Sequence, residues 1–314
     1  RNHSSAASDV YKRQVLLVVV VMSRDLRHGL ERAVRLLMPV FIAMLVWLAL
    51  YSTQTGDYEK AYEFMFSFDW RQINAEMIVS ALTQALFSLS VGIGILIMYG
   101  SYLDERRPLF LGGGSIMLFD TAIALLTCVM IFSIAFAFGM RPDAGIGLIF
   151  QTLPVAFSQM PENGVLWSSA FFMLLLVAAL TSGFALLEPT IALLTDRGRM
   201  SRRSAAWLVG AGAWALGLVS VYSFGEFSFR FYYFGIERTR GFFDVFTLLS
   251  LHVLLPFTAL LIAVFAGWRM PLSTNQDGRI DKPFMSYRLW RWCIRYLAPA
   301  LIVLVLLLVL FYPG

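Results

Sequence analysis

Long apolar segments alternate with short polar ones along most of this 314-residue chain. An α-helix needs roughly 20 apolar residues to cross a bilayer, and most of these segments come close to that length or exceed it. The pattern therefore predicts an all-α fold, a polytopic bundle of transmembrane helices. The predicted spanning helices lie at about residues 34–51, 78–102, 111–139, 165–194, 205–224, 243–267 and 296–312.

The predicted helix at 78–102 differs from the others because its centre contains polar and small residues. It reads Gln84-Ala-Leu-Phe-Ser-Leu-Ser-Val-Gly-Ile-Gly94. Serine and glycine weaken helix propensity here over two consecutive turns. Unpaired backbone groups in hydrocarbon are so unfavourable that a broken helix is tolerated only around a protein-lined or water-filled cavity. We therefore expect a broken helix at this stretch, and a binding site rather than a lipid-facing anchor.

The composition excludes an ordinary soluble domain, because 59% of the residues are hydrophobic, only 14% are charged and the mean hydropathy is +0.71. The net charge of +5 does not indicate a nucleic-acid partner, since the basic residues gather in short segments between apolar runs. The positive-inside rule places such segments in the cytoplasm. It predicts that 23–35, 104–107, 195–203 and 268–295 lie inside, with the start of the chain inside and the C-terminus outside.

Residues 1–14 are polar and unpatterned, and they change abruptly to the apolar run Val15-Leu-Leu-Val-Val-Val-Val-Met22. We interpret 1–14 as a non-native or disordered leader and 15–314 as a single transmembrane domain. The apolar run is far shorter than a spanning helix. We therefore expect that the domain starts within a helix, as in an N-terminally truncated fragment.

Two further helices carry polar groups at membrane depth. Asp120 lies in the predicted helix 111–139, and ionisable residues are rare and unfavourable at such positions, so a functional role is expected. The alternative is that its carboxylate snorkels or pairs with a neighbouring hydroxyl. The stretch Ala178-Ala-Leu-Thr-Ser-Gly183 suits either close helix packing, which uses small and hydroxyl residues, or ligand binding.

Other candidate groups favour structural roles. Gly29 and Pro39 bracket the start of the first predicted helix and make it easy to unwind, although their spacing alone fits an ordinary helix start. His252 fits a packed helical histidine, and Cys128 and Cys293 fit packing residues. An enzyme is not expected, because no nucleophile is placed beside a histidine base and no Gly-x-Ser-x-Gly motif occurs.

The order and spacing of these motifs resemble the neurotransmitter:sodium symporter family, which has the leucine-transporter fold. The motifs are Gln84–Gly94 with Tyr99-Gly-Ser-Tyr102, Ala178–Ser182 with Leu187-Glu-Pro189, Leu153-Pro154 with Met160-Pro161, and the Gly29/Pro39 pair. The resemblance implies that the chain covers the end of helix 4 to helix 11 of a bacterial eleven-helix member, with helices 1 to 3 before it. It also implies a bacterial inner (plasma) membrane location.

Members of the family bind sodium at two sites next to a broken helix. The resemblance therefore implies two sodium sites in this protein. Ser88 and Asp120 would contribute to one of them. The carbonyl oxygen of Ala178 and the hydroxyl groups of Thr181 and Ser182 would contribute to the other. Sodium prefers hard oxygen ligands of this kind. No organic cofactor and no catalytic residue is expected.

The family pattern also implies an amino-acid site with apolar walls. Phe87 would form an aromatic lid, and Ser90 would lie near the backbone groups of the amino acid. The residues implied in substrate binding are Phe87, Ser90, Gly92, Ile93, Ser182, Gly183 and Leu186. Their apolar character favours a bulky hydrophobic or aromatic amino acid.

Asp120 departs from the family pattern, because many relatives have Asn at this position. Chloride-dependent relatives have Ser one turn later, where this chain has Ala124. A fixed carboxylate could offset the charge of the sodium ions. We therefore predict chloride-independent transport.

Gating residues are implied by the same resemblance. Gln84 and Asp244 match the outer gate, and Tyr102 and Asp196 match the inner gate. Without the family pattern, Asp196 would be interpreted as a solvated acid at a helix end.

The Gly29/Pro39 pair matches the family device in which helix 5 unwinds to let water reach a sodium ion from inside. The overall prediction is sodium-coupled symport of an amino acid by alternating access in a lipid bilayer. Formation of a homodimer is left open. The alternatives are a non-transporting membrane scaffold fragment and a related sodium-coupled transporter of another small solute.

Overall fold

The computed structural model describes residues 2–24, 27–67, 69–102, 109–140, 147–160, 163–196, 198, 200–225, 227–233, 236–270 and 287–311. The chain packs as two compact units. The first comprises Arg1–Arg24, Gln72–Met117 and Ala185–Gly314, and the second comprises Asp25–Arg71 and Leu118–Phe184. The division of the chain into a leader and a single domain over 15–314 stays a prediction.

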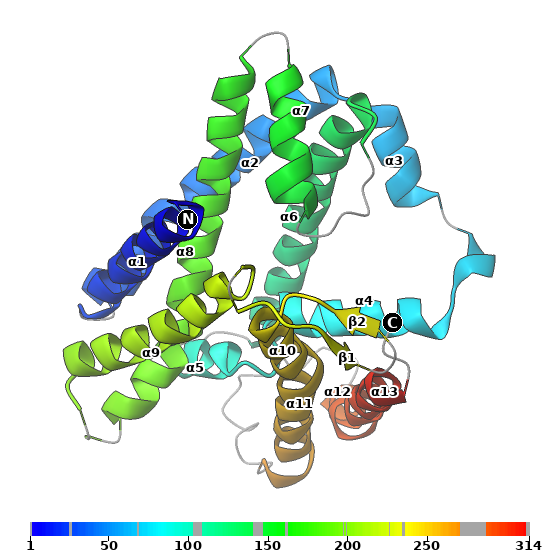
Figure 1. Ribbon diagram of the computed structural model, residues 1–314. Helices are drawn as coiled ribbons and strands as arrows, with labels where there is room; N and C mark the ends of the chain where they lie inside the picture. Colours follow the sequence, from blue (N-terminus) through cyan, green and yellow to red (C-terminus); the bar gives the residue numbers. More distant parts are fainter. Residues whose placement is uncertain are drawn as a thin grey trace. The chain divides into compact units, whose positions relative to one another are not determined.

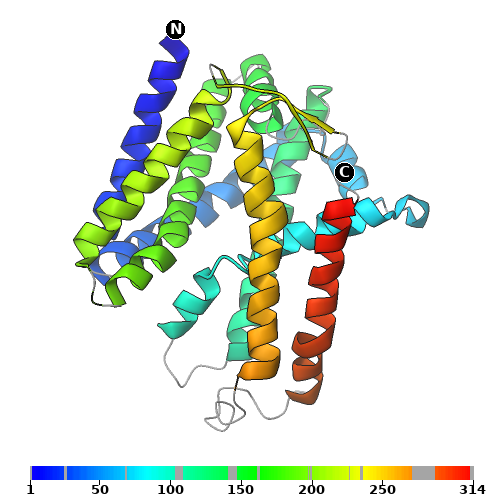
Figure 2. The ribbon, with the colours of Figure 1, turned by 60° about the horizontal axis from the view of Figure 1, so that its bottom comes forward.

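The first unit consists of helices and one β-hairpin (Figure 1 and Figure 2). Its elements are α1 (Asn2–Met22), α4 (Ala75–Ser88), α5 (Ile95–Ser101), α9 (Arg202–Tyr222), β1 (Phe231–Tyr233), β2 (Ile236–Arg238), α10 (Phe242–Thr247), η4 (Leu248–Leu254), α11 (Leu255–Val264), η5 (Phe265–Arg269), α12 (Tyr287–Trp292), η7 (Cys293–Leu297) and α13 (Ala298–Phe311). The elements η4, η5 and η7 are π-helical turns within two longer helices. The two longer helices pack side by side through α11 and α13 (Figure 2).

The second unit is built around an apolar core that includes several aromatic side chains. Its elements are η1 (Arg27–Glu31), α2 (Arg32–Thr55), α3 (Tyr58–Phe66), η3 (Leu148–Thr152) and α7 (Leu153–Gln159). Two long helices, α6 (Leu109–Ala137) and α8 (Gly164–Asp196), contribute residues to both units, and η2 (Trp70–Gln72) is a short 3₁₀ turn. Tyr51 of α2 stacks on Trp167 of α8 with ring centroids 3.3 Å apart, and Phe171 is almost fully buried next to them. Such aromatic pairs bury large apolar areas and stabilise the packing of these helices.

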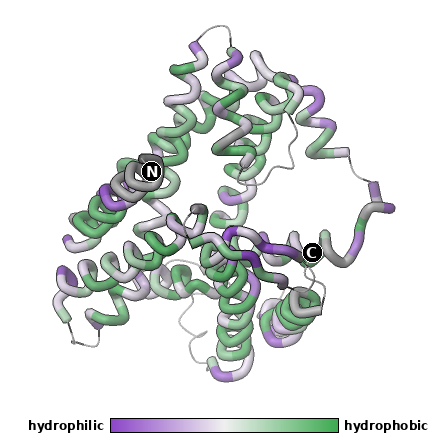
Figure 3. Tube along the Cα trace, in the orientation of Figure 1, coloured by the Kyte–Doolittle hydropathy of each residue, from purple (hydrophilic) through white to green (hydrophobic). Residues whose placement is uncertain are grey.

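In the described part of the chain, six helices are long and apolar enough to cross a membrane. They are Gly29–Thr55, Gly112–Ala137, Gly164–Asp196, Arg202–Tyr222, Phe242–Arg269 and Leu289–Leu308. Figure 3 shows apolar residues along most of their length. Each overlaps one of the predicted spans, so the prediction of a polytopic helical bundle is confirmed. The remaining predicted span, 78–102, is divided between α4 and α5.

Helix α1 packs lengthwise against α9 in the first unit (Figure 2). Val19 lies against Gly210, and the hydroxyl of Tyr11 lies against Gly217 and donates a hydrogen bond to the carbonyl oxygen of Ala213 at 2.9 Å. Small residues on one face of a helix let a neighbouring helix approach closely. The structure has residues 2–14 within this helix, and their interpretation as a non-native or disordered leader stays a prediction.

The β-hairpin was not predicted. Its strands pair antiparallel, with Phe231 opposite Arg238 and Tyr232 opposite Glu237. The residues between the predicted spans 205–224 and 243–267 carry no strand signal, because two strands of three residues leave almost no periodic pattern in a sequence rich in arginine and aromatic residues.

Candidate functional site

The helix that was predicted to be broken is broken in the structure. Helix α4 ends at Ser88 and α5 begins at Ile95. Three residues between them have positive φ angles: Ser90 at 54°, Gly92 at 97° and Gly94 at 88°. Glycine adopts this region freely, whereas a serine there is strained by about 1–3 kcal/mol. Such strain is often found at ligand-binding sites.

Backbone hydrogen bonds close the break into tight turns. The N–H of Ser90 donates to the carbonyl of Phe87 at 3.0 Å, that of Val91 to Leu86 at 2.9 Å, and that of Ile93 to Ser90 at 3.4 Å. These bonds satisfy three amide groups that have left the helical ladder, which is necessary where water is scarce. The break is therefore a defined structure that can present side chains and carbonyl groups to a ligand.

Most of the predicted residues of the first unit lie at this break or near the ends of helices, whereas Leu186 lies inside α8. Gln84, Phe87 and Ser88 lie in the last two turns of α4, and Tyr102 follows α5 directly. The side chains of Phe87 and Tyr102 are each 46% exposed, and that of Leu186 on α8 is 50% exposed. All three side chains thus retain surface that can contact a ligand or another helix.

A buried ion pair connects α8 and α9 in the first unit. Glu188 has no exposed surface, and its carboxylate accepts hydrogen bonds from both terminal nitrogens of Arg202 at 2.9 and 2.7 Å. Arg202 also donates from Nε to the carbonyl oxygen of Arg24 at 2.8 Å. The hydroxyl oxygen of Tyr102 lies 3.5 Å from Oε1 of Glu188. A bidentate arginine–carboxylate pair is among the strongest polar contacts that side chains make.

The ion pair brings one predicted gating residue, Tyr102, next to two residues for which the sequence predicted no role. A signal was present, because Glu188 stands in an apolar helix and needs a cation, and Arg202 follows 14 positions later. Asp196, the other predicted inner-gate residue, is exposed at the last position of α8.

The second unit contains the α8 part of one predicted sodium site. The hydroxyl of Thr181 lies 3.0 Å from the carbonyl oxygen of Ala178 and 3.1 Å from that of Val177. Its proton is thereby directed to its own helix, and the two lone pairs of the hydroxyl oxygen can still bind a cation. Ser182 is exposed on the same helix. Adjacent hydroxyl and carbonyl oxygens of this kind suit a hard cation.

Other predicted sites combine residues of both units. Asp120 is half-buried on α6 in the second unit, whereas Ser88 lies on α4 in the first. The substrate site likewise uses Ser182 and Gly183 from the second unit and Leu186 from the first. How these residues come together stays a prediction.

The pair thought to unwind helix 5 lies in a continuous helical segment. Gly29 lies in the π-helical turn η1, and Pro39 lies inside α2. Proline removes one helical hydrogen bond, and π-helical turns often mark functional sites. Unwinding of this segment stays a prediction.

The predicted outer-gate acid lies in a turn that holds its carboxylate. Asp244 stands in the first turn of α10, and its Oδ2 accepts a hydrogen bond from the backbone N–H of Arg240 at 2.9 Å. Gly241 has a φ of 51°, and a Cβ there would lie 2.7 Å from the carbonyl oxygen of Phe227. The start of a helix also stabilises a negative charge.

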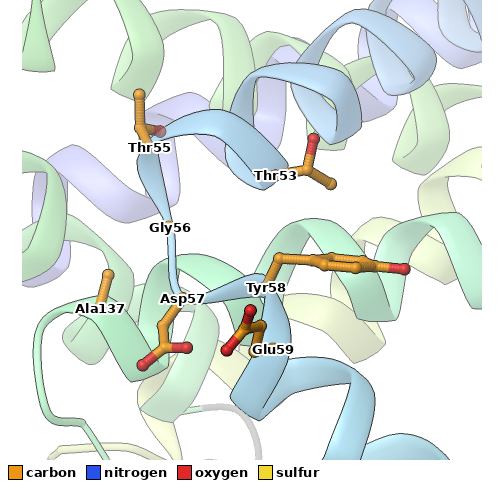
Figure 4. Close-up of a pocket in the computed structure, with 7 residues that line it drawn as sticks. All are labelled: Thr53, Thr55, Gly56, Asp57, Tyr58, Glu59 and Ala137. Atoms are coloured by element: carbon orange, nitrogen blue, oxygen red, sulfur yellow. The ribbon is translucent and has the colours of Figure 1, made fainter.

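A shallow hollow of about 480 Å³ lies in the second unit (Figure 4). It is lined by Thr53, Thr55, Gly56, Asp57, Tyr58, Glu59 and Ala137. Asp57 accepts a hydrogen bond from the backbone N–H of Lys60 and forms a salt bridge of 2.6 Å with its ammonium group. This contact lowers the pKa of Asp57 and raises the pKa of Lys60. The hollow contains none of the residues predicted to bind sodium or substrate.

The sequence profile of the "Sodium:neurotransmitter symporter family" matches residues 9–313. The chain belongs to this family. The sodium:neurotransmitter symporters are secondary transporters and not enzymes, as the sequence predicted.

Individual members and structures agree with this assignment. The sodium-dependent transporter YhdH of Bacillus subtilis (strain 168) is 29% identical over 296 residues, which cover 93% of this chain and 64% of YhdH. A sodium-dependent transporter of Haemophilus influenzae is 28% identical over 297 residues, which cover 95% and 64%. The crystal structure of MhsT in complex with L-phenylalanine matches with a TM-score of 0.83 and 32% identity, covering 94% of this chain and 66% of MhsT. This match confirms the predicted leucine-transporter fold.

The chain thus spans 64% of the length of each of these two sodium-dependent transporters. The activity, substrates and partners of the whole protein are therefore proposed below.

Proposed function

We propose that the protein takes up a hydrophobic or aromatic amino acid together with sodium by alternating access. The observation that carries this proposal is the break between α4 and α5 in a chain of the sodium:neurotransmitter symporter family. Transporters use such discontinuous helices to bind substrate and coupling ions at mid-membrane depth.

The substrate class rests on the lining residues and on one relative. Of the residues proposed to bind substrate, Phe87, Ile93 and Leu186 are large and apolar, and Gly183 has no side chain to occupy space. MhsT, at 32% identity, was crystallised in complex with L-phenylalanine. A pocket of this character favours burial of an apolar side chain by the hydrophobic effect.

For the co-transported ions we propose two sodium sites. Ser88 and Asp120 contribute to one site, and Ala178, Thr181 and Ser182 contribute to the other. The neighbouring oxygens of Thr181 and Ala178 support the second assignment. A fixed carboxylate at Asp120 offsets part of the sodium charge, so transport does not require chloride.

In the proposed cycle, sodium stabilises an outward-open state and the substrate completes the site. Ligands shift such an equilibrium only through their different affinities for the two states. Gln84 and Asp244 act at the outer gate, and Tyr102 and Asp196 act at the inner gate. Unwinding between Gly29 and Pro39 then admits water to sodium from the cytoplasm.

We also propose that the protein resides in a bacterial inner membrane, with the start of this chain in the cytoplasm and Gly314 outside. In this orientation the ion pair Glu188–Arg202 lies beside Tyr102 on the cytoplasmic side.

Uptake by cells that express the gene tests this function. Radiolabelled L-phenylalanine should enter in sodium buffer and not in choline buffer, and unlabelled leucine, tyrosine and tryptophan should compete while aspartate and lysine should not. Replacement of chloride by gluconate should leave uptake unchanged. Uptake that is equal in sodium and choline would contradict the proposal, and chloride-stimulated uptake would contradict the role given to Asp120.

A further inference from the structure

The break between α4 and α5 lies directly against α11 in the first unit. A Cβ on Gly92 would lie 2.6 Å from the carbonyl oxygen of Leu255 and 3.0 Å from the amide nitrogen of Ala259. Leu255 and Ala259 are 4% and 1% exposed, so this face of α11 is covered. The backbone of the break faces the backbone of α11 here, so a Cβ at position 92 would collide with main-chain atoms that cannot rotate away. Only glycine therefore fits here, both for its positive φ and for its space.

One side chain of α11 makes a polar contact with the break. The hydroxyl of Thr258 donates to the carbonyl oxygen of Gly92 at 2.7 Å, which joins residues 166 positions apart. The same hydroxyl lies 2.7 Å from the carbonyl oxygen of Leu254 and 3.0 Å from that of Leu255, both in its own helix. A hydroxyl group has a single proton. The three carbonyl oxygens therefore compete for one donor.

We propose that Thr258 is a positioning residue that holds the break against α11 through Gly92, and that it releases the break by turning its hydroxyl to Leu254. The two acceptors lie at the same distance, so the donor keeps a partner when the carbonyl of Gly92 moves away. A donor without a second acceptor would be left unpaired, which is unfavourable away from water. The contact can thus be made and broken with little change in the hydrogen bonding of α11.

This arrangement links the break to the helix that begins with Asp244. Helix α10 continues through η4 into α11, so the predicted outer-gate acid and Thr258 belong to one continuous helix. A displacement of the break relative to this helix changes the Gly92 contact directly. The role in transport rests on the proposed function, whereas the contact itself does not.

Hydrogen exchange of the purified protein in lipid nanodiscs tests the contact without any transport. In Thr258→Val the hydroxyl is lost and the shape is kept, and amides 89–94 should exchange roughly two- to tenfold faster than in the wild type. Thr258→Ser and Thr258→Ala form a second pair that differs only in the hydroxyl. The serine variant should exchange at this segment more slowly than the alanine variant. Thr127→Val is the matched control, because Thr127 donates to Ile123 of its own helix.

The outcomes distinguish the hydrogen bond of the Thr258 hydroxyl from a role of the Thr258 side chain in packing alone. Equal exchange at 89–94 in wild type and Thr258→Val, or in Thr258→Ser and Thr258→Ala, would overturn the proposal. If Thr258→Val exchanges faster throughout the protein, the serine and alanine pair decides between hydroxyl and packing. In uptake assays, Thr258→Val should raise the KM for L-phenylalanine roughly two- to tenfold and Thr127→Val should not. If the exchange pattern is found but the wild type shows no sodium-dependent uptake, the contact stands and the proposed function fails.

Discussion

The carboxylate of Glu188 is fully buried and is held by both terminal nitrogens of Arg202. Water contributes little to the solvation of this carboxylate, so the guanidinium group is its main polar partner. The pair joins α8 to α9 and places Tyr102 of the predicted inner gate beside it. Tyr102, for which a gating role is proposed, therefore lies at a contact that joins α8 to α9.

Removing the arginine should strongly destabilise the protein, because a buried carboxylate without its cation is penalised by about 3–5 kcal/mol. We expect Arg202→Ala to lower the free energy of unfolding by this amount, measured by chemical unfolding in detergent. The double variant Glu188→Gln with Arg202→Gln should recover a large part of the loss. The exposed pair Glu31–Arg35 is the control, and Arg35→Ala should change stability by about 1 kcal/mol or less. An equally small effect of Arg202→Ala would contradict the account.

The two glycines of the break should respond differently to alanine. Gly94 has a φ of 88°, and a Cβ there would meet no atom within 4 Å, so Gly94→Ala should reveal backbone strain alone, about 1–2 kcal/mol. Gly92→Ala adds a collision with the backbone of α11 at Leu255 and should destabilise the protein more. Thermal unfolding of both variants measures the difference. Equal melting temperatures would show that the break does not lie against α11.

Sodium dependence should be sensitive to one threonine of α8 and not to another. Thr181 and Thr195 have matching contacts, since each hydroxyl lies within hydrogen-bond distance of the carbonyl oxygens three and four positions earlier. Replacing Thr181 by valine removes a proposed sodium ligand. The sodium concentration for half-maximal uptake should rise by about tenfold, because a charge-assisted contact of roughly 1.5 kcal/mol is lost. Thr195→Val should leave it unchanged. The assignment fails if both variants keep the wild-type sodium dependence.

The pair Asp57–Lys60 predicts a pH window at the start of α3. The pKa of Asp57 is lowered below 3.8, so its contribution to stability is present above that pH and is lost as the pH falls through the lowered value. The pKa of Lys60 is raised above 10.5, so its contribution is present below that pH and is lost as the pH rises through the raised value. Lys60→Gln should therefore lower the melting temperature slightly across neutral pH, and the difference should vanish at acidic and strongly basic pH. A difference that is independent of pH would mean that the pair is not electrostatic.

The break could be predicted from the sequence because it is a local property. Serine and glycine within Gln84–Gly94 weaken the helix wherever it lies, and the long apolar runs define the spans by length alone. Ser90 was not expected to carry strain, since nothing in a serine residue by itself indicates a φ of 54°.

Contacts between distant residues could not be predicted in the same way. Thr258 looks like any hydroxyl in an apolar helix, and its bond to Gly92 depends on how two helices pack. Arg202 looked like one of several cytoplasmic arginines, and only burial of Glu188 distinguishes it. The sodium and substrate sites that combine both units stay predictions for the same reason.

Accumulation against a concentration gradient is the most direct test of the proposed coupling between sodium and the entry of an apolar amino acid. Purified protein in proteoliposomes, with an inward sodium gradient imposed, should accumulate radiolabelled L-phenylalanine above its external concentration. Addition of a sodium ionophore should abolish the accumulation, and an equal potassium gradient should not support it. Accumulation that persists after the sodium gradient is dissipated, or that follows potassium equally well, would contradict the account.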